Sequence, residues 1–230
     1  MWYRFSRDFS KYTLFENFEE VLSALLNALR NWNPENAQAL ISEFNSQQHI
    51  FQSTELQMQV SLRLEQKGVW AGFAEYYFGK LTQLQYIYLN VDYIFKFGQQ
   101  FNENDVRRAI IHELQHAVEH NYDKTKLLSE KEQTKKQNWI ESYHEKHPDN
   151  DRTLDIEYIN TPTEIRATLA EIFASLDLPQ NKETVKEELG KPTYENLKQL
   201  IENHERWGRF KYMSPKAIRY MIDELYKAIY

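Results

Sequence analysis

The feature that most constrains this chain is the segment His112-Glu113-Leu114-Gln115-His116. A helix turns by about 100° per residue, so two histidines four positions apart point the same way, one turn above the other. Two imidazoles in that relation can bind one zinc ion, and the glutamate after the first histidine can reach a water on the metal without being a ligand. The segment is therefore expected to be helical and to face a second element that completes the site.

The residues around this motif fit an amphipathic helix in the required phase. Apolar side chains recur at helical spacing and predict its buried face: Val106, Ile110, Leu114, Ala117 and Val118. The histidines fall on another face together with the small Ala109, which leaves room above His112. Asn102 or Asn104 can cap the start of this helix.

The composition limits the kinds of site and partner. Of 230 residues, 41% are hydrophobic, which is enough for one core with helical additions. The chain has 0 cysteines, so disulfide frameworks and cysteine zinc sites are excluded, and a zinc ion must be bound by His, Glu or Asp. The net charge of −6 comes without a basic stripe, so a nucleic-acid partner is not expected.

Targeting segments are not expected either. The N-terminal residues lack the apolar core of a signal peptide, and no run approaches the ~18 apolar residues of a membrane span. The expected location is the cytoplasm. The abundance of Asn, Gln, Lys, Tyr and Phe hints at an AT-rich genome and hence at a bacterial or phage-infected cell.

The segments before the motif are expected to be two helices followed by strands. Residues 14–31 carry apolar side chains at helical spacing, and Pro34 suits the first turn of a second helix through about Phe44, so a helical hairpin is predicted. Residues 55–65 alternate between apolar and polar, which predicts a half-buried strand. Residues 83–95 form a second predicted strand.

Two features of this strand region stay open. The aromatic residues 69–79 fit either a strand or a loop. The strand predicted over 83–95 can be an edge strand that pairs with an extended peptide beside the metal site, or an ordinary paired strand.

After the motif, residues 122–152 are polar and are expected to form a lid or a solvated insertion, followed by an extended stretch over 153–161. Thr161-Pro162-Thr163 then predicts a helix start, because proline is favoured in the first helical turn. The remaining residues, 181–230, predict two or three short helices.

The third zinc ligand is expected from the helix that starts near Pro162. A catalytic zinc site has three protein ligands and a water. Glu164 is the main candidate, because it begins the helix and has the small Ala167 beside it for close helix packing. Glu171 on the same face is the first alternative, and the others are His120, Glu157 and His144.

The motif together with Thr-Pro-Thr-Glu-Ile-Arg-Ala over residues 161–167 resembles the gluzincin branch of the zincin metallopeptidases. It is particularly similar to small bacterial and phage zincin-like proteins with a downstream Pro-x-Glu-(Ile)-x-Ala element, and the similarity covers about residues 84–176. The metzincin pattern instead requires Gly and His at the positions of Glu119 and Tyr122.

The chain departs from the larger, thermolysin-like gluzincins in two ways. The spacing from His116 to Glu164 is longer than is usual. Those proteins also have an aspartate four residues after the glutamate ligand, where this chain has Thr168. The residue that orients a ligating histidine is thus unassigned, and Glu171 could be that residue or the ligand itself.

The resemblance implies an α+β fold, namely a helix-rich zincin-like domain with a small β-sheet preceding the motif helix. We expect a metallopeptidase core over residues 51–180, an N-terminal helical segment over 1–50 packed on it, and a C-terminal helical segment over 181–230.

The implied function is hydrolysis of peptide bonds in a protein or peptide substrate. Zn²⁺ bound by His112, His116 and Glu164 would activate a water, with Glu113 as the general base. Tyr158 is the candidate for stabilising the oxyanion, followed by Tyr143 and His144, although Tyr158 fits a plain core position equally well. One alternative is a non-catalytic zincin-like scaffold or interaction protein that retains the zinc site, for example a phage structural or regulatory protein. Another is a peptidase-like toxin or regulator with one protein target.

Overall fold

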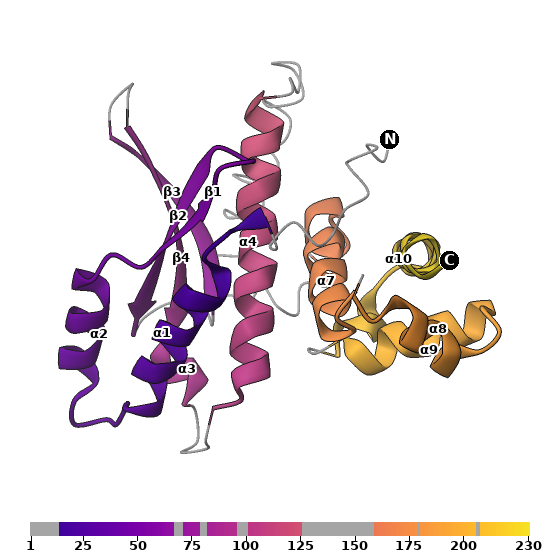
Figure 1. Ribbon diagram of the computed structural model, residues 1–230, viewed down its shortest axis with the longest axis horizontal. Helices are drawn as coiled ribbons and strands as arrows, with labels where there is room; N and C mark the ends of the chain where they lie inside the picture. Colours follow the sequence, from indigo (N-terminus) through magenta and orange to yellow (C-terminus); the bar gives the residue numbers. More distant parts are fainter. Residues whose placement is uncertain are drawn as a thin grey trace.

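The computed structural model of the 230-residue chain describes residues 14–66, 71–78, 82–95, 101–125, 159–178, 180–205 and 208–230, and for 71–78, 82–84, 93 and 120–125 it describes the backbone alone. Its elements, shown in Figure 1, are α1 (Phe18–Arg30), α2 (Ala37–Ser46), β1 (Ile50–Ser53), β2 (Met58–Glu65), β3 (Ala71–Phe78), β4 (Thr82–Asn90), α3 (Val91–Ile94), α4 (Glu103–Thr125), α7 (Pro162–Ser175), α8 (Lys182–Leu189), α9 (Tyr194–His204), the 3₁₀ helix η4 (Arg209–Tyr212) and α10 (Pro215–Ile229).

The four strands form one mixed sheet in the order β1-β2-β4-β3. The central strands β2 and β4 are parallel, with Leu62 opposite Ile87 and Leu64 opposite Leu89. β1 and β3 pair antiparallel at the two edges. The four paired leucine and isoleucine side chains are almost fully buried, so they mark the face of the sheet that is turned towards the core.

Helices α1 and α4 share a hydrophobic core with this sheet face. Buried side chains of both helices, among them Leu25 and Ile110, belong to one cluster with the strand residues. At the protein surface two ion pairs connect the helices, Arg30 with Glu103 at 2.6 Å and Arg107 with Glu19 at 2.5 Å. The long helix α4 is therefore fixed between the sheet and the rest of the molecule (Figure 1).

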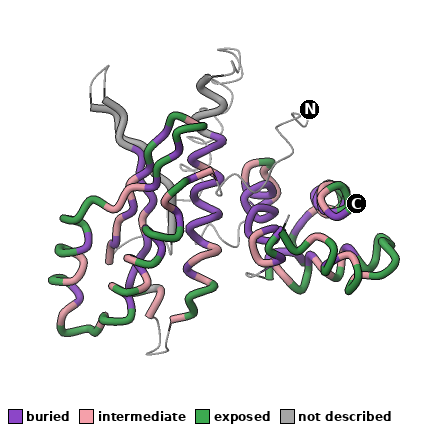
Figure 2. The backbone as a smooth tube through the Cα atoms, in the orientation of Figure 1, coloured by how far each residue is buried: buried purple, intermediate pink, exposed green. Residues whose placement is uncertain are grey.

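Helix α7 packs against α4 on the side away from the sheet and joins a second core cluster with the C-terminal helices. That cluster contains Leu169 and Phe173 of α7 together with Ile201 of α9 and Met221 of α10. The helices α8 to α10 expose much of their outer surface, whereas α7 and the middle of α4 are mostly buried (Figure 2).

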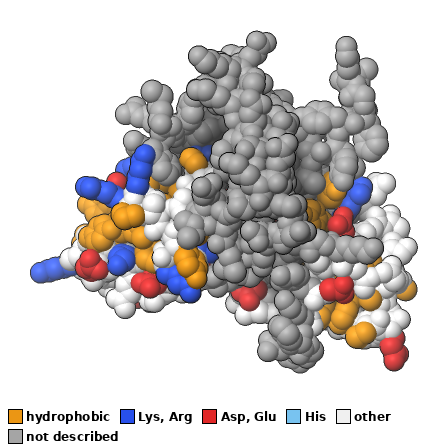
Figure 3. All heavy atoms as spheres, turned by 180° about the vertical axis from the view of Figure 1, so that it is seen from behind, with side chains coloured by type: hydrophobic (Ala, Val, Ile, Leu, Met, Phe, Trp, Pro, Cys, Tyr) orange, Lys and Arg blue, Asp and Glu red, His pale blue; other side chains and the backbone are white. Residues whose placement is uncertain are grey.

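The surface of the C-terminal helices is mixed in character. Among the described residues, the exposed large hydrophobic side chains are tyrosines: Tyr194, Tyr212, Tyr226 and Tyr230. Seen from behind, these helices show apolar side chains interspersed with lysines and arginines (Figure 3). Within the described part of the chain, no helix has both the length and the hydropathy of a membrane span.

The main predictions about the fold are confirmed at the coarse level. The molecule is helix-rich α+β, the strands expected near 55–65 and 83–95 lie in one sheet, and the motif helix packs against it. The helix that starts at Pro162 and the short C-terminal helices are also present. The aromatic stretch that was open between strand and loop contains β3.

The ends of several elements differ from the predictions. The strand expected over 83–95 stops at Asn90, whose Oδ1 accepts a hydrogen bond from the Asp92 backbone N–H and so starts the helical turn α3. The strand expected over 55–65 begins only at Met58, because Thr54–Gln57 form a turn in which Gln57 has a φ of 50°.

The second helix begins at Ala37 and not at Pro34. The Asn36 side chain accepts a hydrogen bond from the Asn33 backbone N–H at 2.9 Å, and the Asn33 side chain accepts one from the Asn36 backbone N–H at 3.0 Å. This reciprocal pair holds residues 33–36 in a turn, and α2 follows it. Of the two alternatives open for 83–95, the structure shows the ordinary paired strand, because β4 is interior and β3 occupies that edge of the sheet.

Candidate metal centre

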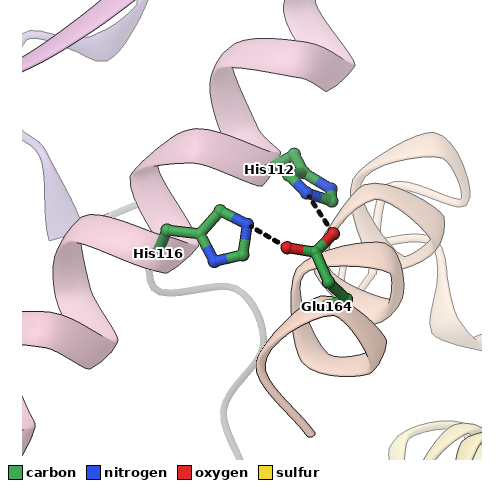
Figure 4. A group of neighbouring side chains, drawn as sticks. All are labelled: His112, His116 and Glu164. Carbon is green, nitrogen blue, oxygen red and sulfur yellow. Dashed lines mark ion pairs between the residues drawn. The ribbon is translucent and has the colours of Figure 1, made fainter. Parts of the chain in front are cut away.

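Helix α4 contains both histidines of the motif, and its apolar face is part of the hydrophobic core. Asn102 caps it, since its Oδ1 accepts hydrogen bonds from the backbone N–H groups of Asn104 and Asp105 at 3.0 and 3.4 Å. The predicted apolar stripe is buried against the sheet and α1. The histidine face consequently points away from the sheet, towards α7 (Figure 4).

Helix α7 presents its charged residues to this face. Its start is set by Thr161, whose Oγ1 accepts a hydrogen bond from the Glu164 backbone N–H at 3.4 Å, and by Pro162 in the first turn. Every residue from Glu164 to Phe173 is buried, because α7 lies between α4 and the C-terminal helices. Charged side chains in such a helix need partners, since an isolated buried charge is very unfavourable.

Glu164 meets both histidines of the motif (Figure 4). Its Oε1 lies 3.0 Å from Nε2 of His116, and its Oε2 lies 3.3 Å from Nε2 of His112. The three side chains each offer a ligand atom, and these atoms all lie within 4.8 Å of one another. The group could therefore hold a metal ion.

Glu171 contacts the other side of the His112 ring. Its Oε1 lies 2.5 Å from Nδ1 of His112, and Glu171 lies about two helical turns beyond Glu164 on the same face of α7. Both carboxylates come from α7, so the two nitrogens of one imidazole are held by the same helix. Of the two candidates on α7 for a third ligand, Glu164 joins the group that could hold a metal ion, and Glu171 lies in the position of a residue that orients the ring.

Glu113 is buried beside this group. Burial raises the pKa of its carboxyl, and the charges of His112 and His116 partly offset that effect. Glu113 and Glu164 lie close enough for their charges to interact. A carboxylate in this position, near the ligands but outside the group that could bind the metal, can accept a proton from a water at the site.

Two of the candidate ligand side chains, His112 and Glu164, have shifted pKa values as well. Burial alone would lower the pKa of His112, but hydrogen bonds to Glu164 and Glu171 and the charges of both carboxylates raise it to about 10. Burial acts against ionisation of Glu164, yet the charge of His116 and the hydrogen bonds from both histidines hold its pKa well below the usual range. The carboxylate thus stays ionised, which is the state that binds metal.

A second buried network fastens α7 to α4 next to the site. Arg166 donates to both oxygens of Glu119, from Nε and from a terminal nitrogen, each at 2.7 Å. Gln115 donates to the same carboxylate at 2.9 Å. This bidentate pair fixes the distance between the helices one turn beyond the histidines.

Several residues singled out in the sequence lie outside the described part of the chain. These are Tyr158 and its alternatives Tyr143 and His144, together with Glu157, and the stretches 126–152 and 153–158. His120 lies in α4, where only its backbone is described. The oxyanion-stabilising role and the lid or solvated insertion therefore stay predictions.

One charged residue near the site was not anticipated. Nη1 of Arg209, in η4, lies 3.6 Å from Glu164 Oε2. It belongs to the C-terminal helical segment, and no spacing rule connects it with the motif, so no sequence signal pointed to it.

Comparisons with known protein families, curated proteins and solved structures find no match for this chain.

Proposed function

We propose that this chain is a zinc-dependent metallopeptidase of the zincin type, acting on a protein or peptide substrate. The observation that carries the proposal is the convergence of His112 and His116 of the motif on Glu164 of α7, with Glu113 buried beside them. Two imidazole nitrogens and one carboxylate are a donor set of catalytic zinc sites.

The spacing of the donor atoms agrees with a zinc ion. Two ligand atoms bound to tetrahedral zinc at its usual bond lengths are separated by about 3.4 Å. The two His–Glu164 contacts measure 3.0 and 3.3 Å. These contacts involve the two different oxygens of Glu164, and the three candidate ligand atoms lie within 4.8 Å of one another, so the side chains must adjust for one ion to be bound between them. The buried Glu113 beside the group favours a catalytic site over a structural one, because a structural zinc site needs no base.

Each residue of the site has a separate role in the proposed reaction. Zinc, when bound, polarises the scissile carbonyl and lowers the pKa of a water molecule towards ~7. His112, His116 and Glu164 would hold the ion, and Glu171 would keep His112 in the orientation in which Nε2 faces it. Glu113 would take the proton of the attacking water and deliver it to the leaving amine nitrogen.

An extended substrate can be bound by the sheet. β3 is an edge strand, antiparallel to β4, and α4 packs against it. Its outer backbone groups are suited to pair with a peptide by strand addition, which would lead the chain of the substrate past the motif helix. This assigns to β3 the role that the sequence offered to 83–95.

The test compares Glu113→Gln with wild type on an unbiased peptide library. The substitution keeps size and polarity but removes the base, so we expect normal folding, zinc content near one ion per chain and a loss of hydrolysis by several orders of magnitude. Glu103→Gln is the matched control, since Glu103 is an exposed residue of the same helix, and it should be fully active.

Two outcomes would contradict the proposal. Cleavage by Glu113→Gln at the wild-type rate would assign the activity to another site or to a contaminant. Inactivity of both proteins, together with a protein side chain in the fourth zinc position, would identify a non-catalytic zinc-binding scaffold.

A further inference from the structure

Arg209 lies inside the protein at the edge of the candidate metal centre. Its side chain is only 8% exposed, and its Nη1 lies 3.6 Å from Glu164 Oε2, the oxygen that also faces Nε2 of His112. The guanidinium is close enough to Glu113 for its charge to act on that carboxyl too. One buried cation from the C-terminal segment thus faces two carboxylates of the site.

The turn that contains Arg209 is held in place by Glu205 and by the second core cluster. Glu205, buried at the end of α9, accepts hydrogen bonds through Oε2 from the backbone N–H groups of Arg209 and Phe210, at 2.8 and 3.4 Å. Gly208 precedes them with a φ of 63°, which glycine adopts without strain. Phe210 is buried in the second core cluster, so η4 cannot shift without disturbing that core.

Charge explains what this arrangement does. Glu113, Glu164 and Glu171 are three acidic side chains buried close to one metal site, and like charges in a poorly solvated place repel one another. The guanidinium beside Glu164 opposes that repulsion from a fixed position. A neutral side chain there would leave the Glu164 carboxylate with a weaker electrostatic anchor and more freedom to turn.

We propose that Arg209 is a positioning residue of the metal centre, which holds the Glu164 carboxylate in place for the ion, so that η4 and Glu205 are part of the site. The inference rests on the metal site of the proposed function and extends it to the C-terminal segment. A metal-binding core cut off before η4 would lack this anchor even if it contained the motif and Glu164.

The test measures zinc affinity of the full chain by competition with a chromophoric chelator. Arg209→Met should weaken zinc binding by about 10- to 100-fold, as is typical when an outer partner of a ligand is lost. Arg209→Lys keeps the charge and should recover part of the loss. Arg219→Met removes an exposed arginine of α10 and is the matched control, with the affinity of wild type.

A spectroscopic readout separates positioning from mere support of the fold. With Co²⁺ in place of zinc, the visible bands report the ligand arrangement, and they should change in Arg209→Met but not in Arg219→Met. Circular dichroism of the metal-free proteins checks that both are folded. If Arg209→Met does not fold, Arg209→Gln, which is polar but neutral, replaces it in the same measurements.

The outcomes distinguish this inference from the proposed function. Wild-type zinc affinity and an unchanged Co²⁺ spectrum in the neutral variant would overturn the role of Arg209 while the metal site stands. The same result combined with slower peptide hydrolysis would overturn it in favour of a contact with the substrate. Absence of zinc binding in wild type would remove the metal site itself and the inference with it.

Discussion

Glu171 Oε1 lies 2.5 Å from Nδ1 of His112, and this contact decides which nitrogen of the ring faces the candidate metal centre. With Nδ1 held by Glu171, Nε2 points to Glu164 Oε2, 3.3 Å away. One helix, α7, therefore contributes both a candidate ligand and the group that orients the histidine on the facing helix. Metal-binding histidines generally have such a carboxylate or carbonyl partner on the second nitrogen.

The two carboxylates of α7 are predicted to differ in their effect on zinc binding. Glu164→Ala should abolish stoichiometric zinc after dialysis, because a ligand is lost. Glu171→Ala should weaken zinc binding by about 10- to 100-fold, because only the orientation of His112 is lost. Glu171→Gln keeps an acceptor oxygen and should lie closer to wild type. A larger loss in Glu171→Ala than in Glu164→Ala would reverse the assignment of ligand and orienting residue.

Zinc binding is predicted to release protons. The pKa of His112, raised to about 10 by Glu164 and Glu171, means that the metal-free protein holds a proton there at neutral pH. Zinc binds neutral imidazole, so this proton must leave, and the apparent affinity should rise with pH until about 10. Isothermal titration calorimetry at pH 7 in buffers of different ionisation enthalpy should give at least about one proton per zinc ion. Zinc binding without proton release would contradict this prediction.

The same group should make the metal-free protein sensitive to alkali. The His112 pKa is raised on folding, so its stabilising contribution is complete below the ordinary value of 6.5 and is lost as pH rises through about 10. Thermal unfolding of chelator-treated protein should show a falling midpoint over this range. His112→Asn lacks the titrating ring and is expected to show a flatter profile there.

Those parts of the site that depend on local sequence rules could be predicted. The phase of the motif helix follows from its apolar residues, and the start of α7 follows from the Thr161-Pro162 capping pattern, which in turn places Glu164 in the first turn. Both rules act within a few residues, so one sequence is sufficient to apply them.

The remaining parts depend on how distant segments pack. Glu171 was an open alternative because its contact with His112 requires the crossing geometry of α4 and α7, which no pattern encodes. Arg209 is brought to Glu164 by the fold of the C-terminal helices. The end of β4 at Asn90 depends on a local contact. The apolar alternation continues through Val91 and predicts a longer strand, but the Asn90 side chain accepts a hydrogen bond from the Asp92 backbone N–H and starts a helical turn there.

The cap of α7 is predicted to affect both stability and metal binding. Thr161→Ala removes the oxygen that accepts from the Glu164 N–H and should lower the free energy of unfolding by about 1 kcal/mol. Because the cap holds the turn that carries Glu164, zinc affinity should fall as well. Thr193→Ala is the matched control, since Thr193 caps α9 in the same manner at 3.2 Å but lies away from the site. Thr193→Ala should lower the free energy of unfolding by a similar amount and leave the zinc affinity unchanged. An equal loss of zinc affinity in both variants would contradict the role of the Thr161 cap in holding Glu164.

The pair of Arg166 and Glu119 is predicted to matter far more than an ion pair at the surface. Removing one partner of a buried bidentate pair leaves the other charge without its counterion, so Arg166→Met should cost about 3–5 kcal/mol of unfolding free energy. Arg30→Met breaks an exposed pair with Glu103 and should cost about 0–1 kcal/mol. Chemical denaturation of both variants measures the difference.

A double substitution tests whether the cost comes from the orphaned charge. Arg166→Met combined with Glu119→Gln removes the buried carboxylate together with the guanidinium, and Gln can still meet Gln115. The double variant should therefore be more stable than Arg166→Met alone, because a buried amide is less costly to leave partly unpaired than a buried ion. If the double variant is instead as unstable as the sum of both single changes, the arginine stabilises α7 through packing, and the charge pair is not what fastens the two helices of the site together.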